Sequence, residues 1–188
     1  MSNFQLKSLK IMRGTIHYCL EETILEKYGA EKWSKCLTTM GLPANHSFAT
    51  QIIDDIDEEL TMKFITNVPT VLECSLQQVF DDFGIYWSAV YAPNLYSMFY
   101  VGVTTTKQML LKLSSIHHMV GRVREGSTPP QFQYDELAEN KMQITYMSKR
   151  GLFDLYLSLV KGLDVYFKND TQIDKISDSK AVMTFSHY

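Results

Sequence analysis

Apolar residues recur at helical spacing through the first part of the chain, and this pattern predicts two helices before residue 41. The first helix is expected over residues 15–28 and is ended by Gly29, and the second is expected over residues 30–40. An acidic run at residues 54–59 is typical of a further helix start, where negative side chains favour the helix dipole. The apolar residues with helical spacing in the first helix are Ile16, Leu20, Ile24 and Leu25.

Two further helices are predicted to begin at capping motifs. Residues 75–78 have the S-x-x-Q form and residues 105–108 have the T-x-x-Q form of a capping box. The second of these helices is expected to run for about twenty residues and to end at Gly126. The apolar face of the first consists of Val79, Phe83, Trp87, Val90 and Tyr91. The apolar stripe of the second consists of Met109, Leu113, Ile116, Val120 and Val123.

Beyond Pro130 the hydrophobic pattern changes from helical spacing to alternation. The stretches QFQYD and KMQITYMSKR flank an acidic turn, which predicts an antiparallel pair of strands. A helix over residues 152–167 follows, and residues 171–187 read as two more strands around an Asp-Ser turn. The helix carries Leu155, Leu159 and Leu163 in register. The fold class is therefore α+β, with a mainly helical N-terminal half, a long helix and a small antiparallel sheet that has one inserted helix.

Composition restricts the class of protein. A chain of 188 residues, 45% of them hydrophobic, is long enough for one well-buried domain. The net charge of -3 argues against a nucleic-acid-binding protein, and no apolar run approaches the roughly 18 residues of a membrane span. The N-terminus lacks the apolar core of a signal peptide. Cys19, Cys36 and Cys74 are odd in number, lie in apolar segments and lack CxxC spacing, which predicts reduced core thiols in a cytoplasmic protein.

One predicted strand ends in an unusual row of polar side chains. Alternation places Tyr146, Ser148 and Arg150 on the same face as the apolar Met142 and Ile144. A phenol, a hydroxyl and a guanidinium together are donors well suited to hold carboxylate groups. The ordinary interpretation is a strand that leaves the core, with Arg150 reaching water. The three residues by themselves favour this ordinary interpretation over a carboxylate-binding site.

A histidine borders the apolar stripe of the long helix. His117 lies one turn after Leu113, whereas its neighbour His118 is expected to point toward solvent. Such a residue is usually a core histidine with satisfied hydrogen bonds, but a buried neutral imidazole also suits a haem iron. Zinc is poorly supported, because His17 and His46 are distant in sequence and no carboxylate follows at i+4. A cysteine–histidine nucleophile has no supporting pattern, although the sequence does not exclude it.

The order of these motifs resembles a known family. The chain resembles the H-NOX family in the stretch LSSIHHMVGRVREGSTPPQF, followed by ITYMSKR and an apolar helix. H-NOX domains are haem proteins that bind nitric oxide or oxygen, and they also occur in soluble guanylate cyclase. The resemblance begins at MRGTI and covers nearly the whole chain. It implies the H-NOX fold and haem b (iron protoporphyrin IX). It also implies a single domain over 1–188, with an extension at 1–11, a distal helical part at 12–75 and a proximal helix and sheet part at 76–188.

The resemblance also implies roles for individual residues. His117 matches the proximal ligand of the haem iron, and Pro130 matches a proline that presses on the haem. Family members that hold oxygen have a tyrosine five residues beyond the motif arginine, and Leu155 occupies that position here. The residues that match the propionate-binding set are Tyr146, Ser148 and Arg150. The expected distal residues are Ile16, Leu20, Trp87 and Leu155.

These roles predict a gas sensor, not an enzyme. The implied function is nitric oxide binding at ferrous haem, release of the iron–His117 bond, and signalling to a separate cytoplasmic histidine kinase or diguanylate cyclase. A donor from Trp87, Tyr86 or Tyr91 would instead favour an oxygen- or redox-responsive haem protein. A haem-free interaction module is a third hypothesis. A haem peroxidase would need a distal acid–base pair, which the expected distal residues do not supply.

Overall fold

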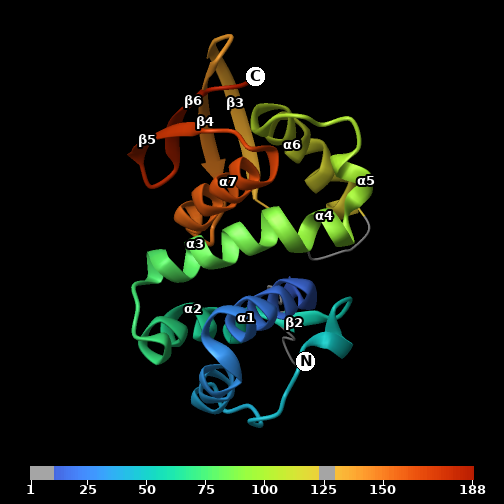
Figure 1. The fold of residues 1–188 in the computed structure, drawn as a ribbon, viewed down its shortest axis with the longest axis vertical. Coiled ribbons are helices and arrows are strands. Elements are labelled where there is room, and N and C mark those ends of the chain that lie inside the picture. The colour runs from blue at the N-terminus through green and yellow to red at the C-terminus, as the bar shows by residue number, and fades with distance from the viewer. Residues whose placement is uncertain (1–10, 123–129) are drawn as a thin grey trace, which may run out of the picture. The chain divides into compact units, whose positions relative to one another are not determined.

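The computed structural model describes residues 11–122 and 130–188, which fall into two compact units. The first unit contains residues 11–76 and is mainly helical. The second contains residues 77–122 and 130–188 and includes a four-stranded antiparallel sheet (Figure 1). The predicted α+β class is confirmed. No described helix is both long enough and apolar enough to cross a membrane.

The first unit begins with a pairing that the sequence pattern did not predict. Strand β1 (Ile11–Arg13) pairs antiparallel with β2 (Asp55–Asp57), so the prediction that the whole acidic run opens a helix is wrong for its first residues. Helix α2 (Glu58–Leu72) starts after Asp57, whose side chain accepts a hydrogen bond from the Glu59 backbone N–H at 2.8 Å. A short 3-10 turn, η1 (Ala49–Gln51), completes the unit.

Helix α1 (Gly14–Thr39) joins the two helices that the periodicity predicted. It bends at Gly29, whose φ of 83° lies outside the helical region and is readily adopted only by glycine. Its buried face contains His17, Glu21 and Ile24, whereas Ile16 and Leu20 are only half-buried. The predicted apolar stripe was therefore correct for Ile24 alone, because polar side chains of this helix find buried partners in distant segments.

Two of those buried polar side chains each make a hydrogen bond to a segment distant in sequence. The Glu21 carboxylate accepts from the Phe48 backbone N–H at 2.7 Å, and His17 Nε2 lies 3.0 Å from the Thr61 hydroxyl oxygen. The His17 ring packs against the rings of Phe48 and Phe64, with centroids 5.1 and 5.7 Å away. Burial in this aromatic surrounding lowers the pKa of His17 to about 4.

We expect this histidine to make stability depend on pH. Between pH 6.5 and about 4 the unfolded chain binds a proton at His17 that the folded chain does not, so the free energy of unfolding should fall as the pH falls through this window. The full effect is about 3 kcal/mol. Urea unfolding at several pH values gives the free energy of unfolding as a function of pH. This free energy should change less with pH in His17→Gln than in the unchanged protein. An equal dependence on pH in the two proteins would contradict the expectation.

In the second unit, the predicted helix from residue 76 is interrupted by a wider turn. Helix α3 (Leu76–Tyr86) continues into the π-helical turn η2 (Trp87–Tyr91) and then into α4 (Ala92–Leu95). The extra residue in a π turn rotates the following side chains relative to an ideal helix. Val90 is consequently 44% exposed, and its predicted place on the apolar face is wrong.

Helix α6 (Thr106–Arg122) follows the short α5 (Ser97–Tyr100) and begins at the predicted cap. The Thr105 hydroxyl accepts from the Gln108 N–H at 3.3 Å, and the Gln108 side-chain oxygen accepts from the Thr104 N–H at 3.0 Å. The predicted helix end at Gly126, the residue Val123 and the side chain of Val120 lie outside the described part of the chain.

The antiparallel sheet and its inserted helix agree with the alternation in the sequence. Strands β3 (Gln131–Ala138) and β4 (Lys141–Met147) form one hairpin, and β5 (Thr171–Ser177) and β6 (Lys180–Phe185) form another, in the order β3-β4-β6-β5. Helix α7 (Phe153–Phe167) packs on this sheet (Figure 1). The fully buried core side chains include Met142, Ile144, Val160, Ala181 and Met183.

All three cysteines are free thiols, as predicted, but Cys74 is half-buried, so its predicted place in the core is wrong. Cys19 and Cys36 are fully buried, and burial raises the pKa of Cys36 to about 11. A thiol with so high a pKa carries little of the reactive thiolate at neutral pH. The burial of this pair therefore argues against a cysteine nucleophile at either position.

Candidate functional site

The polar row at the end of β4 differs from the prediction. Tyr146 shares the buried face of β4 with Met142 and Ile144, and its backbone N–H donates to the Ser179 carbonyl at 2.7 Å. The strand ends at Met147, so Ser148 and Arg150 lie in the following turn and not on the strand face.

The turn after β4 has its own local hydrogen bond. The Arg150 backbone N–H donates to the Ser148 hydroxyl oxygen at 3.2 Å, and both residues are half-buried. Short polar side chains that bond the backbone two residues on are typical of turns. The three residues therefore remain near one another in the chain, but turn geometry, not strand alternation, places Ser148 and Arg150.

His117 is held in the protonation state that a metal ligand requires. It lies on α6, and its Nδ1 is 3.4 Å from the Pro130 carbonyl oxygen, a long hydrogen bond. A carbonyl oxygen only accepts, so Nδ1 carries the hydrogen and Nε2 of the neutral ring keeps its lone pair. Burial lowers the pKa of His117 below its ordinary value, so the ring is neutral at pH 7.

This donor set fits a single axial ligand. In residues 11–122 and 130–188 there is no group of three or more His, Cys, Asp or Glu side chains that could hold a metal ion. An Nδ1–H bonded to a backbone carbonyl is the usual arrangement for a histidine that ligates a metal through Nε2. His117 therefore suits a group that supplies its other iron ligands itself, as the porphyrin of a haem does.

Phe132 links His117 to the strand that carries Tyr146, a connection that the sequence reasoning missed. The Phe132 ring centroid lies 5.4 Å from that of His117 and 5.8 Å from that of Tyr146. The alternation in QFQYD places Phe132 and Tyr134 on one face of the strand, but no local pattern could place that face against His117.

Leu155 and Tyr156 occupy different sides of α7. Tyr156 is 3% exposed and packs against Phe132 with a centroid distance of 4.7 Å, whereas Leu155 is half-buried and lies outside the sheet core. Burial, and to a lesser extent the neighbouring Tyr134, raises the pKa of Tyr156 well above its usual value. The Tyr156 hydroxyl therefore stays protonated within the core of the sheet.

The remaining predicted site residues come from three elements. Trp87 opens the π turn η2, and its ring contacts those of Phe83 and Tyr91 at 5.8 and 5.5 Å. Helix α7, which carries Leu155, packs on this turn. Ile16 and Leu20 belong to α1 in the first unit, where both are half-buried.

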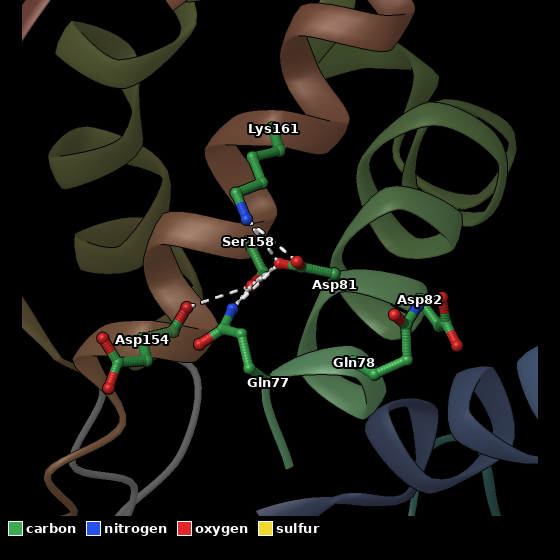
Figure 2. A network of polar contacts seen from close by, with 7 residues as sticks. All are labelled: Gln77, Gln78, Asp81, Asp82, Asp154, Ser158 and Lys161. Carbon is green, nitrogen blue, oxygen red and sulfur yellow. Dashed lines mark hydrogen bonds and ion pairs between the residues drawn. The ribbon is translucent and has the colours of Figure 1, made fainter. Parts of the chain in front are cut away.

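A polar network centred on the buried Ser158 hydroxyl and the half-buried Asp81 joins α3 to α7 and was not predicted from the sequence (Figure 2). The fully buried Ser158 hydroxyl donates to Asp81 Oδ1 at 2.6 Å, and Lys161 Nζ lies 2.9 Å from both carboxylate oxygens of Asp81. Gln77 also donates to Asp81, at 2.9 Å. Burial opposes the charge on Asp81, but the donors from Lys161, Ser158 and Gln77 hold the pKa of this carboxyl below its usual value.

Two glycines allow the backbones of α3 and α7 to touch beside this network. A Cβ added at Gly162 would collide with the Gly84 carbonyl oxygen and would lie 2.9 Å from the Ile85 Cα. A Cβ added at Gly84 would lie 2.6 Å from the Ser158 carbonyl oxygen. These positions therefore require glycine because of close packing, and they bring the turn that begins at Trp87 against α7.

The comparison with known families decides the assignment. The model of the haem-NO-binding family matches residues 13–175. The chain belongs to the haem-NO-binding family. This is a family of haem-binding gas-sensor domains, also called H-NOX domains, and haem is accordingly the cofactor of this chain. The search of curated protein sequences found no match.

Solved H-NOX structures have the same fold. A mutant of the Cs H-NOX domain with 4-cyano-L-phenylalanine at site 5 matches with a TM-score of 0.84 and 18% identity, over 94% of this chain and 97% of that one. An oxygen-binding H-NOX domain related to soluble guanylate cyclases, in its oxygen complex, matches with a TM-score of 0.80 and 18% identity, over 94% and 96%. A mutant of T. Tengcongensis H-NOX matches with a TM-score of 0.82 and 18% identity, over 94% and 98%. The predicted H-NOX fold is confirmed.

Proposed function

We propose that this haem-NO-binding domain senses nitric oxide in preference to oxygen. His117 would ligate ferrous haem through Nε2, and Tyr146, Ser148 and Arg150 would hold the propionates. Pro130 would contact the haem, and Ile16, Leu20, Trp87 and Leu155 would surround the gas. The haem would supply the iron centre to which the gas binds. These roles, and the division into a distal part at 12–75 and a proximal part at 76–188, remain predictions.

The observation that carries the proposal is the placement of Leu155 and Tyr156 on α7. The side chain of Leu155 has no hydrogen-bond donor, and the hydroxyl of Tyr156 is buried in the sheet core beside Phe132. Bound oxygen is partly anionic and gains from a charge-assisted hydrogen bond, whereas nitric oxide depends much less on one. The absence of a donor at position 155 therefore supports selectivity for nitric oxide.

A second candidate is an oxygen sensor, and Trp87 is the observation that favours it. Its half-buried indole stands in the turn η2, against which α7 packs, and an indole N–H is a hydrogen-bond donor. If this donor reached the gas, it would replace the tyrosine that position 155 lacks.

The absorption spectrum of the reduced, purified protein tests both candidates. We expect a Soret band that shifts when nitric oxide is added and that does not change to a stable oxygen-bound form in air. Trp87→Phe should leave both results unchanged. A stable oxygen-bound spectrum would contradict the proposed selectivity, and its loss in Trp87→Phe would establish the second candidate.

The proposal includes signalling to a separate cytoplasmic partner, a histidine kinase or a diguanylate cyclase. Release of His117 would change the second unit, and the change becomes a signal only if the partner binds the two states unequally. The measurement is the affinity of the partner for the protein with and without nitric oxide. Equal affinities, together with unchanged partner activity, would contradict this part of the proposal.

A further inference from the structure

Phe132 has no role in the proposed function, yet its ring packs against that of His117 and against three other rings. Phe132 stands on β3, and its ring lies between 4.7 and 6.1 Å, centroid to centroid, from four other rings. Three are the tyrosine rings of the sheet core and one is the imidazole of His117. The tyrosines are Tyr134 at 6.1 Å, Tyr146 at 5.8 Å and Tyr156 at 4.7 Å.

We propose that Phe132 is a positioning residue for His117, whose ring orientation it sets and whose movement it transmits into the sheet. This inference rests on the proposed function, because it concerns His117 as the iron ligand. Phe132 itself has no role in binding the gas or the iron.

Two contacts from the start of β3 determine the orientation of the imidazole. The Pro130 carbonyl accepts from Nδ1, but at 3.4 Å this hydrogen bond is long and by itself permits the ring to tilt. The Phe132 ring lies 5.4 Å away at an interplanar angle of 37°, within the range of favourable aromatic pairs. Of these two contacts, only the long hydrogen bond would remain after loss of the Phe132 ring.

The sheet core prevents Phe132 from simply following the imidazole. Tyr156, behind it, is 3% exposed and is itself stacked on the fully buried Phe153, with an interplanar angle of 11°. Closely packed interiors do not deform continuously, so displacement of one ring either breaks a contact or moves the neighbouring rings as well. Release of His117 should therefore displace the rings of Tyr156 and Phe153 or break their contacts.

The same ring also connects the iron ligand to the strand that carries Tyr146. Strand β3 pairs with β4 so that Phe132 stands opposite Tyr146, and their rings are 5.8 Å apart. A movement of His117 that displaces Phe132 therefore acts directly on a residue of the proposed propionate-binding set. This arrangement gives the protein a short mechanical path from α6 to the sheet.

The test compares Phe132→Leu with the control Phe185→Leu in the haem-loaded protein. Phe185 is a matched residue, because it is a buried phenylalanine of the same sheet core but belongs to β6, which β4 separates from β3. We expect Phe132→Leu to shift or broaden the iron–histidine stretching band in the resonance Raman spectrum of the ferrous protein. After nitric oxide is added, His117 should leave the iron faster by roughly 2- to 10-fold, the factor expected from one lost aromatic pair.

Phe185→Leu should lower the thermal stability but leave the iron–histidine band and the rate of His117 release unchanged. Phe132→Met, which fills more of the volume, is measured in parallel in case the leucine variant does not fold. An unchanged band and rate in the Phe132 variants, or an equal change in Phe185→Leu, would overturn the inference. Absence of haem from the unsubstituted protein would instead overturn the proposed function, and the inference with it.

Discussion

A His117→Gly variant is expected to lose the bond between the protein and the haem iron, and added imidazole should restore it. Glycine removes the only atom, Nε2, that the neutral ring offers to a metal, because Nδ1–H is directed to the Pro130 carbonyl. Free imidazole can occupy the space that the side chain leaves. The measurement is the iron–histidine stretching band of the ferrous protein, which should be absent in the variant and replaced by an iron–imidazole band on addition.

The neighbouring histidine supplies a matched control for this experiment. His118→Gly makes the same chemical change one residue further along α6, and it should leave the iron–histidine band in place. Retention of a normal band in His117→Gly, or loss of the band in His118→Gly, would show that His117 is not the ligand. The pair of variants therefore separates the two histidines, whichever result is obtained.

A Gly162→Ala variant is expected to be strongly destabilised, although alanine is the better helix former. In an exposed helix the substitution should stabilise by roughly 0.5–1 kcal/mol. Here the added Cβ would collide with the Gly84 carbonyl oxygen and would lie 2.8 Å from the Ser88 Cβ, so α7 must move away from α3. Overpacking of this kind costs about 3 kcal/mol, a large part of the roughly 5–15 kcal/mol that stabilises a typical domain.

Urea unfolding checks the effect of Gly162→Ala, and Val165→Ala on the same helix is its control. Val165 is 57% exposed, so its truncation should change the free energy of unfolding by no more than about 0.5 kcal/mol. Ser158 lies one turn before Gly162 on α7. The displacement of α7 should therefore also weaken the hydrogen bond from Ser158 to Asp81. A Gly162→Ala variant as stable as Val165→Ala would mean that the two backbones separate at little cost.

Periodicity predicted most of the secondary structure because each element follows from local side-chain spacing. The two hairpins and α7 were located from alternation and from the apolar helix between them. Gly29 was predicted to end one helix before a second, and α1 instead continues through it with a bend. His117 could be singled out because it is an imidazole beside an apolar stripe. The type of residue and its neighbours at i−4 and i+3 are visible in the sequence.

The errors lie where local spacing does not control the backbone. Alternation extended the strand to Arg150, but β4 ends at Met147 and a turn begins. Ideal helical spacing placed Val90 on the apolar face, but the π turn rotates it outward. The pairing of β1 with β2 was missed, since three-residue strands carry little pattern and their partner lies more than forty residues away.

The sequence by itself determined the α+β class, the chemistry available at His117, and the donors at Tyr146, Ser148 and Arg150. It did so because these properties depend on residue type and on spacing along one chain segment. Only the tertiary structure decided that Pro130 holds the tautomer of His117, that Phe132 joins this ring to the sheet, and that Gly84 and Gly162 bring α3 against α7. Each of these is a contact between segments distant in sequence, and such contacts arise from packing that no local pattern encodes.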